Sequence, residues 1–268
     1  MTPQDILDHL ERARLWDAPL SAEAGFDLPA AYACALQVRA LRIARGEMPA
    51  GYKIGFTNRT IWARYNVFAP IWGTMWESTV SFSDAHGEGV LCLSGTCQPR
   101  LEPEIVFGLK AAPCTDPTPQ QLFEAIDWIA PGFEVVQSHL PDWKFLPSDT
   151  VADGGLHARL LVGPRRPVQS VASGAQALDA ALAQASVVLS RDGKQMESGT
   201  GTNVLGSPLQ ALRHFVQTLR TCEGAPQLQA GDVITTGTWT DAWPIEPGQR
   251  WRASFSLSDL AVGVRLEA

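Results

Sequence analysis

Three glutamates lie in apolar, strand-like segments, where a carboxylate is costly to bury unless it is paired or binds a metal. Glu102 and Glu104 flank a proline in segment 100–109, and Glu134 lies in segment 131–136. Residues two apart face the same side of a strand, so Glu102 and Glu104 repel each other unless a cation or protons separate them. Three carboxylates without His or Cys suit Mg²⁺ or Mn²⁺. The alternative is a solvated strand face.

The segments that position these glutamates predict a β-rich region. From about residue 80 onward, short apolar runs alternate with Gly, Asp and Pro, which is typical of strands and turns. Asp192 and Gly193 stand between two such runs and predict a hairpin. Pro103 has no N–H to donate to a sheet, so it predicts an edge position or a bulge in the strand that carries Glu102.

Helices are expected at three places. In segment 27–47 apolar residues recur at helical spacing. Thr118 with Pro119, and Ser207 with Pro208, provide an N-cap and a first-turn proline for helices over 120–130 and 209–222. The chain is therefore predicted to be α+β, with a small, partly helical N-terminal part (1–80) and a β-rich catalytic domain (81–268).

Composition excludes several classes of function. Lys and Arg number 21 against 28 Asp and Glu, a net charge of −7 without a basic run, so no nucleic-acid partner is expected. No apolar run approaches the ~20 residues that cross a bilayer, and no secretory signal is visible, so no membrane partner is expected. The five cysteines form no C-x-x-C pair, which fits a reducing, cytoplasmic location.

Several short motifs occur together and in a fixed order. This set resembles the 2-keto-4-pentenoate hydratase and 4-oxalocrotonate decarboxylase-like branch of the fumarylacetoacetate hydrolase superfamily. The resemblance covers residues ~50 to 265. It rests on residues 53–57, 98–105, 131–136, 142–144, 149–153, 198–201, 205–208 and 228–232.

The resemblance implies a mixed β-sandwich or roll, a homo-oligomer, and Mg²⁺ or Mn²⁺ held by Glu102, Glu104 and Glu134. It also implies a small-molecule 2-oxo acid substrate with Lys53 beside it. Such a substrate can chelate the cation through its carboxylate and its 2-oxo oxygen, and the metal then stabilises an enolate. Lys53 is expected to add positive charge there or to move a proton.

Further substrate contacts are expected from residues within or close to the shared motifs, namely Arg100, Lys144, Asp153, Thr236 and Thr238. The two threonines can bind a carboxylate through hydroxyl and backbone N–H groups. A strand-ending turn is the alternative for this Thr-Gly-Thr segment.

The chain departs from the hydratase pattern where the distal half of the substrate should bind. Glu77 stands one position away from an expected Asp, and His157 follows the motif that ends at Asp153. A histidine can activate water at neutral pH, so His157 is a candidate base; a packed histidine is the alternative. His9 with Glu11 is a second candidate acid–base pair.

These departures favour hydrolytic carbon–carbon cleavage of an acylpyruvate, such as maleylpyruvate or fumarylpyruvate, with release of pyruvate. The alternative is a 2-hydroxypenta-2,4-dienoate hydratase or a 4-oxalocrotonate decarboxylase. A non-catalytic subunit predicts the loss of a metal ligand or of Lys53, and all four residues are present. The glycines at 199 and 201 lack the third glycine of a dinucleotide fingerprint.

Overall fold

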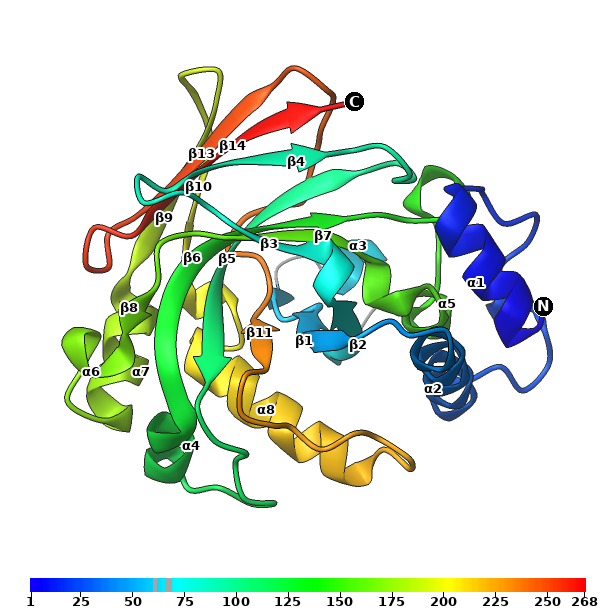
Figure 1. The fold of residues 1–268 in the computed structure, drawn as a ribbon, viewed down its shortest axis with the longest axis horizontal. Coiled ribbons are helices and arrows are strands. Elements are labelled where there is room, and N and C mark those ends of the chain that lie inside the picture. Colours follow the sequence, from blue (N-terminus) through cyan, green and yellow to red (C-terminus); the bar gives the residue numbers. More distant parts are fainter. Residues whose placement is uncertain (60–61, 66–68) are drawn as a thin grey trace.

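The computed structural model describes residues 1–59, 62–65 and 69–268. Two β-sheets form the body, and helices cover them at the side and the base (Figure 1). Strands in the first sheet follow the order β2-β1-β11-β5-β6-β7-β3, with β12 beside β5 and β8 beside β6. These strands are β1 (Pro49–Gly55), β2 (Ile71–Trp76), β3 (Val80–Phe82), β5 (Arg100–Leu109), β6 (Ile126–Val136), β7 (His157–Val162), β8 (Arg166–Pro167), β11 (Val233–Thr235) and β12 (Trp243–Pro244).

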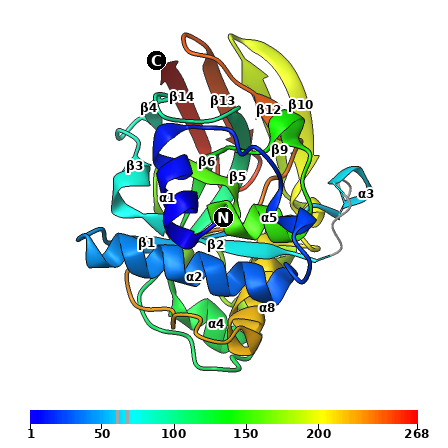
Figure 2. The same cartoon turned by 90° about the vertical axis from the view of Figure 1, so that its right-hand side faces the viewer.

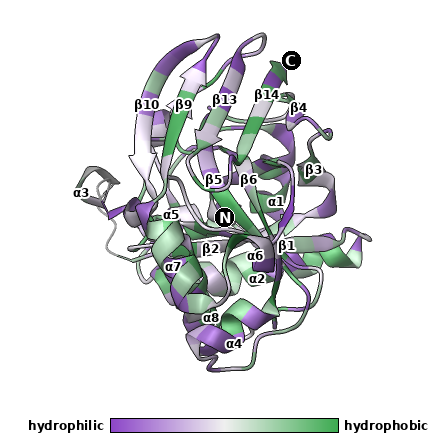
Figure 3. Ribbon diagram, turned by 90° about the vertical axis from the view of Figure 1, so that its left-hand side faces the viewer, coloured by the Kyte–Doolittle hydropathy of each residue, from purple (hydrophilic) through white to green (hydrophobic). Residues whose placement is uncertain are grey.

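The second sheet has the order β10-β9-β13-β14-β4. Along β13 exposed and buried residues alternate, which is the period-two pattern of a sheet with one face on the core. Figure 3 shows hydrophilic and hydrophobic residues mixed along these strands. Its strands are β4 (Glu88–Cys92), β9 (Ser186–Arg191), β10 (Lys194–Thr200), β13 (Arg250–Phe255) and β14 (Ala261–Glu267).

Helices pack around both sheets, and the main core joins Leu182, Phe215, Trp239 and Trp251. None of the helices in the described part of the chain is long and apolar enough to span a membrane. The helices are α1 (Pro3–Arg12), α2 (Leu28–Ala44), α3 (Trp62–Tyr65), α4 (Pro119–Ala125), α5 (Pro147–Ala152), α6 (Val168–Val171), α7 (Ala175–Gln184) and α8 (Pro208–Thr221). Short 3₁₀ turns are η1 (Leu20–Ala22), η3 (Glu77–Thr79), η4 (Pro141–Trp143), η5 (Gly154–Leu156) and η6 (Gly201–Asn203).

The expected α+β class with a small helical N-terminal part is confirmed. Thr118 and Ser207 cap α4 and α8, because each hydroxyl accepts the N–H of the residue three positions on. Asp192 and Gly193 form the β9–β10 turn. Strands on both sides of residue 80 share the first sheet. The two-part division and the homo-oligomer stay predictions.

Two local predictions are wrong. The helix expected over 120–130 ends at Ala125, because Ile126 begins β6, which pairs along β5 and is buried over most of its length. Pro103 lies in an interior strand rather than at a sheet edge. One edge of β5 pairs with β6. Along the other edge, Arg100–Leu101 pair with β12 and Val106–Gly108 pair with β11. Pro103 therefore falls in a gap between two partner strands, where a missing N–H breaks no ladder bond.

Asp149 of α5 is fully buried and attaches the N-terminal helices to the body. Figure 2 shows α1 and α2 on this side of the molecule, with α5 next to them. Its carboxylate accepts the Ser21 N–H at 2.8 Å and the Ser21 hydroxyl at 2.6 Å, and it also accepts the Leu146 N–H at 2.9 Å. Nearby, Ile6 and Trp16 pack in one apolar cluster with residues of the body. A single carboxylate thus ties the segment between α1 and α2 to α5.

We therefore expect Asp149→Ala to lower the free energy of unfolding by about 2–3 kcal/mol. Each hydrogen bond to a charged group contributes about 1.5–3 kcal/mol, but the loss of several bonds to one carboxylate is less than the sum of the single losses. Urea unfolding measures the loss, and limited proteolysis should cut the segment around Ser21 faster. Ser21→Ala, which removes one of the bonds, should give a smaller effect. Equal protease resistance in all three proteins would contradict this anchor.

Candidate metal centre

Two neighbouring strands bring the three predicted glutamates together. Glu102 on β5 pairs directly with Glu134 on β6, and Glu104 follows two residues later on the same face. One carboxylate oxygen of each residue lies within 4.8 Å of the others. Glu104 and Glu134 are fully buried, and Glu102 is partly buried. The structure thus places three acids where a single cation can reach all of them.

The electrostatics of the three carboxylates fit a cation. Burial raises the pKa of Glu102 to about 7 despite the opposing charge of Lys53. Burial, with the charges of Glu134 and Glu102, raises the pKa of Glu104 well above its ordinary value. Glu104 Oε1 is buried and has no hydrogen-bond donor among the described residues, and buried Glu134 Oε2 has only the ion pair with Lys53. Buried carboxylate oxygens with few donors fit Mg²⁺ or Mn²⁺, which prefer oxygen ligands.

Lys53 reaches the carboxylates from β1 and is 3% exposed. Its Nζ lies 3.3 Å from Glu134 Oε2. Burial disfavours the ammonium form, but the charges of Glu134, Glu102 and Glu104 outweigh it and raise the pKa of Lys53. Gly155, at φ +71°, leaves room for this side chain, since a Cβ there would lie 3.1 Å from Lys53 Cδ. The prediction that Lys53 lies beside the metal ligands agrees with this geometry.

The loop after β11 closes one side of the site. The Gly237 N–H donates to Glu104 Oε2 at 2.7 Å, and Gly237 has φ +99°. A Cβ there would lie 1.8 Å from Thr57 Oγ1, so only glycine fits. The Thr236 hydroxyl donates to the Ile105 carbonyl, and the Thr238 hydroxyl donates to the Thr240 carbonyl. Thr238 lines the site, whereas the side chain of Thr236 serves the fold.

A pocket opens over Glu102 and Lys53, and we call it the metal pocket. It has an aromatic wall: the rings of Phe56 and Phe145 are 6.2 Å apart, and those of Trp143 and Phe145 are 6.1 Å apart. Among its described lining residues, Lys53 is the one basic side chain, and Glu102 and Asp241 are the acidic ones. The pocket therefore combines charged groups with an aromatic surface.

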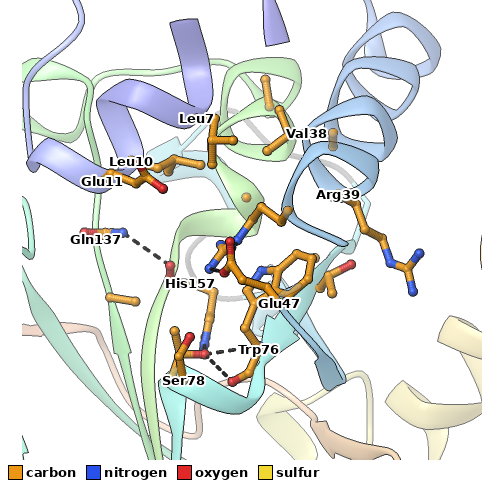
Figure 4. A pocket seen from close by; sticks show the side chains of 18 of the residues that line it. Leu7, Leu10, Glu11, Val38, Arg39, Glu47, Trp76, Ser78, Gln137 and His157 are labelled. Carbon is orange, nitrogen blue, oxygen red and sulfur yellow. Dashed lines mark hydrogen bonds and ion pairs between the residues drawn. The ribbon is translucent and has the colours of Figure 1, made fainter. Parts of the chain in front are cut away.

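His157 lies next to the metal ligands but outside the metal pocket as its described lining residues define it. Its Nδ1 is 2.9 Å from Glu134 Oε1, and its Nε2 is 2.9 Å from the Thr79 hydroxyl oxygen. Burial lowers the pKa of His157, although Glu134 acts to raise it. The ring lines a separate cavity beneath α1 and α2 (Figure 4).

Four predicted residues lie elsewhere. Asp153 is buried against His139, with 2.6 Å between carboxylate oxygen and Nδ1, so its carboxylate is already hydrogen-bonded. The Lys144 side chain is 81% exposed and pairs with Asp142 at 3.4 Å. Glu77 is exposed in η3 and is not among the lining residues of the metal pocket. The guanidinium of Arg100 lies 4.3 Å over the Trp143 ring rather than along the pocket lining.

The second candidate pair, His9 with Glu11, does not reach the metal pocket. His9 Nδ1 is 3.2 Å from the Arg14 carbonyl, and Glu11 forms an ion pair with Arg45. Sequence reasoning missed Phe56, Phe145 and Thr79. Phe56 lies within the shared motif 53–57 and Phe145 directly follows the motif 142–144, which was a usable signal. For Thr79, nothing in the sequence indicates its contact with His157.

Fold and site together define a metal-binding enzyme of one family. Residues 64–265 match the family model described as fumarylacetoacetate (FAA) hydrolase C-terminal, and the chain belongs to this family. It is 33% identical to 2-hydroxyhexa-2,4-dienoate hydratase of Comamonas testosteroni over 82% of this chain and 80% of that protein.

Solved structures agree. The 4-oxalocrotonate decarboxylase from Pseudomonas putida G7, complexed with magnesium and adipate, superposes with a TM-score of 0.85 and 25% identity, covering 98% of this chain and 95% of that one. Fumarylpyruvate hydrolase from Pseudomonas aeruginosa, in complex with Mn²⁺ and pyruvate, superposes with a TM-score of 0.60 and 17% sequence identity. The match covers 81% of this chain and 88% of that one, and it is a likeness of fold alone. The chain is thus an enzyme of the hydratase and decarboxylase branch, and the hydratase or decarboxylase alternative is better supported than the hydrolase.

The raised pKa of Glu102 predicts how pH acts on the metal-free protein. An unfolded glutamate ionises near 4.5 and Glu102 only near 7, so its stabilising contribution is complete below 4.5 and is lost as pH rises through about 7. Glu102→Gln should therefore raise Tm in EDTA more at pH 8 than at pH 5. Mn²⁺ should raise the Tm of the unaltered protein at pH 8. A Glu102→Gln effect independent of pH would contradict the assignment.

Proposed function

We propose that this protein is a divalent-metal-dependent hydratase that adds water to 2-hydroxyalka-2,4-dienoates with an apolar end, using Mg²⁺ or Mn²⁺. The observation that carries the proposal is the metal pocket itself. Glu102 and Lys53 line it together with the aromatic rings of Phe56, Trp143 and Phe145. A substrate with a pyruvyl-type head and an alkyl tail matches this combination of charged and aromatic groups.

Each part of the site has a task in this reaction. Glu102, Glu104 and Glu134 would hold the cation, which when bound supplies Lewis-acid stabilisation of negative charge on the substrate's 2-oxygen. Hydration to a 4-hydroxy-2-oxo acid adds one water: its hydroxyl bonds to C4, while its proton and the proton lost by the enol oxygen end up on C3 and C5. Lys53 is the proton carrier nearest to these carboxylates, and its raised pKa keeps it protonated at neutral pH.

The aromatic wall supports the hydratase over the other reactions of the branch. 4-Oxalocrotonate and fumarylpyruvate each carry a second carboxylate, which needs a cation or several donors when it is buried. Lys53 is the basic residue among the described lining side chains, and it is already paired with Glu134. Decarboxylation of 4-oxalocrotonate is the second candidate, because the overall likeness to that decarboxylase covers nearly the whole chain.

A substrate panel tests the reaction. With Mg²⁺ or Mn²⁺, we expect 2-hydroxyhexa-2,4-dienoate to lose its dienol absorbance and yield a 4-hydroxy-2-oxo acid. Its kcat/KM should exceed those for 4-oxalocrotonate and fumarylpyruvate by about 100-fold or more, since an unpaired buried group costs several kcal/mol. EDTA should abolish turnover. Faster CO₂ release from 4-oxalocrotonate would assign the decarboxylase instead, and faster pyruvate release from fumarylpyruvate the hydrolase.

Lys53→Met tests the proton carrier. We expect kcat to fall by about 10²–10⁴-fold, the usual contribution of a positioned acid or base. Mn²⁺ affinity should not weaken, because the substitution removes a cation that competes for Glu134. Lys53→Arg keeps the charge but not the shape and serves as the control for charge alone. Near-normal kcat in Lys53→Met would exclude this role.

A further inference from the structure

His157 lies between the metal ligand Glu134 and a second cavity of the protein. On one side is Glu134, whose other oxygen is 3.3 Å from Lys53. On the other side is a cavity of about 370 Å³ between α1, α2 and β2, lined by Leu7, Glu11, Val38, Trp76 and Ser78 among others. Figure 4 shows His157 beneath this cavity, which we call the second cavity.

A bulge in β7 directs the ring toward Glu134. Val135 pairs with Arg159, but Val136 pairs with His157, so β7 has one extra residue at Ala158. Residues directly opposite each other in a sheet face the same side, and so do residues two apart. His157 therefore shares the face of Val136 and Glu134, and a regular register would have put Ala158 there. Bulges are commonly used to redirect a side chain in this way.

Both ring nitrogens are engaged. Glu134 is an acceptor, so Nδ1–H donates to its Oε1 over 2.9 Å. Nε2, which carries no proton in this tautomer, accepts from the Thr79 hydroxyl at 2.9 Å; the Trp76 N–H donates to the same hydroxyl oxygen at 3.2 Å, and the Trp76 carbonyl at 2.9 Å is the alternative acceptor for its single proton. The Gln137 amide donates to the His157 carbonyl at 3.3 Å. The imidazole is thus held on both edges, and Glu134 receives a donor of fixed direction.

We propose that His157 is a positioning residue for the metal ligand Glu134, with Thr79 orienting its ring. The Nδ1–H bond holds one oxygen of Glu134, so that the other faces Lys53 and the proposed cation. His157 is not among the described residues that line the metal pocket, so it acts through Glu134. This role rests on the proposed metal centre. Partners of this kind change metal affinity by about 10–100-fold when they are removed.

The test is Mn²⁺ affinity of the full-length protein, measured by electron paramagnetic resonance. His157→Ala should weaken binding by about 10–100-fold. His157→Asn places its amide nitrogen near the position of Nδ1 and should keep affinity close to that of the unaltered protein. His157→Gln places its amide near Nε2, next to Thr79, and should behave like the alanine variant.

The second cavity allows a rescue that a merely structural role would not produce. Because the ring lines this cavity, imidazole added to His157→Ala can enter from there and donate to Glu134. We expect imidazole to recover most of the lost Mn²⁺ affinity, and thiophene, a ring of similar size without an N–H, to recover none. Imidazole should leave the unaltered protein unchanged.

Several results would overturn the proposal. One is unchanged Mn²⁺ affinity in His157→Ala; another is rescue by thiophene as well as imidazole. A third is His157→Asn with full affinity and no turnover, which would make His157 a base. If the unaltered protein binds no Mn²⁺, the metal centre itself fails. Should His157→Ala not fold, Thr79→Val decides: it should weaken binding several-fold while Thr79→Ser does not, and equal affinity rejects the role.

Discussion

Repulsion among three buried carboxylates is the constraint on which the rest of the site depends. Oxygens of Glu102, Glu104 and Glu134 lie within 4.8 Å of one another, and burial raises the cost of charging them. Lys53 offsets part of that repulsion, and the Gly237 N–H and the imidazole of His157 satisfy single oxygens. Glu104 Oε1 has no donor among the described residues and Glu134 Oε2 has only the Lys53 ion pair, so the proposed cation completes the balance.

These compensating groups come from segments far apart in the chain, so the site exists only when the first sheet has formed. Lys53 arrives on β1, the Gly237 N–H on the loop after β11, and His157 on β7, while the glutamates lie on β5 and β6 between them. The N-terminal helices join through Asp149, and they roof the second cavity rather than the metal pocket. The three glutamates and Lys53 lie in the motifs on which the family resemblance rests.

The sequence determined those features that have a local physical cause. Period-two spacing placed Glu102 and Glu104 on one face, and the cost of burying a lone carboxylate singled out Glu134. The hydroxyl caps at Thr118 and Ser207 marked two helix starts, because an N-cap needs only the residues beside it. The choice of Lys53 came from the family motif, and the structure places it 3.3 Å from Glu134.

Only the tertiary structure decided which distant segments meet. Ile126 follows a good helix start, yet it lies in a strand because pairing with β5 outweighs local propensity. Asp153 belongs to a shared motif, yet its carboxylate is hydrogen-bonded to His139 inside the core. The bulge at Ala158 turns His157 toward Glu134, and His157 is not among the described residues that line the metal pocket. Each outcome depends on strand register and on burial by residues far away in the sequence. The free energy of these long-range contacts cannot be read from a short segment.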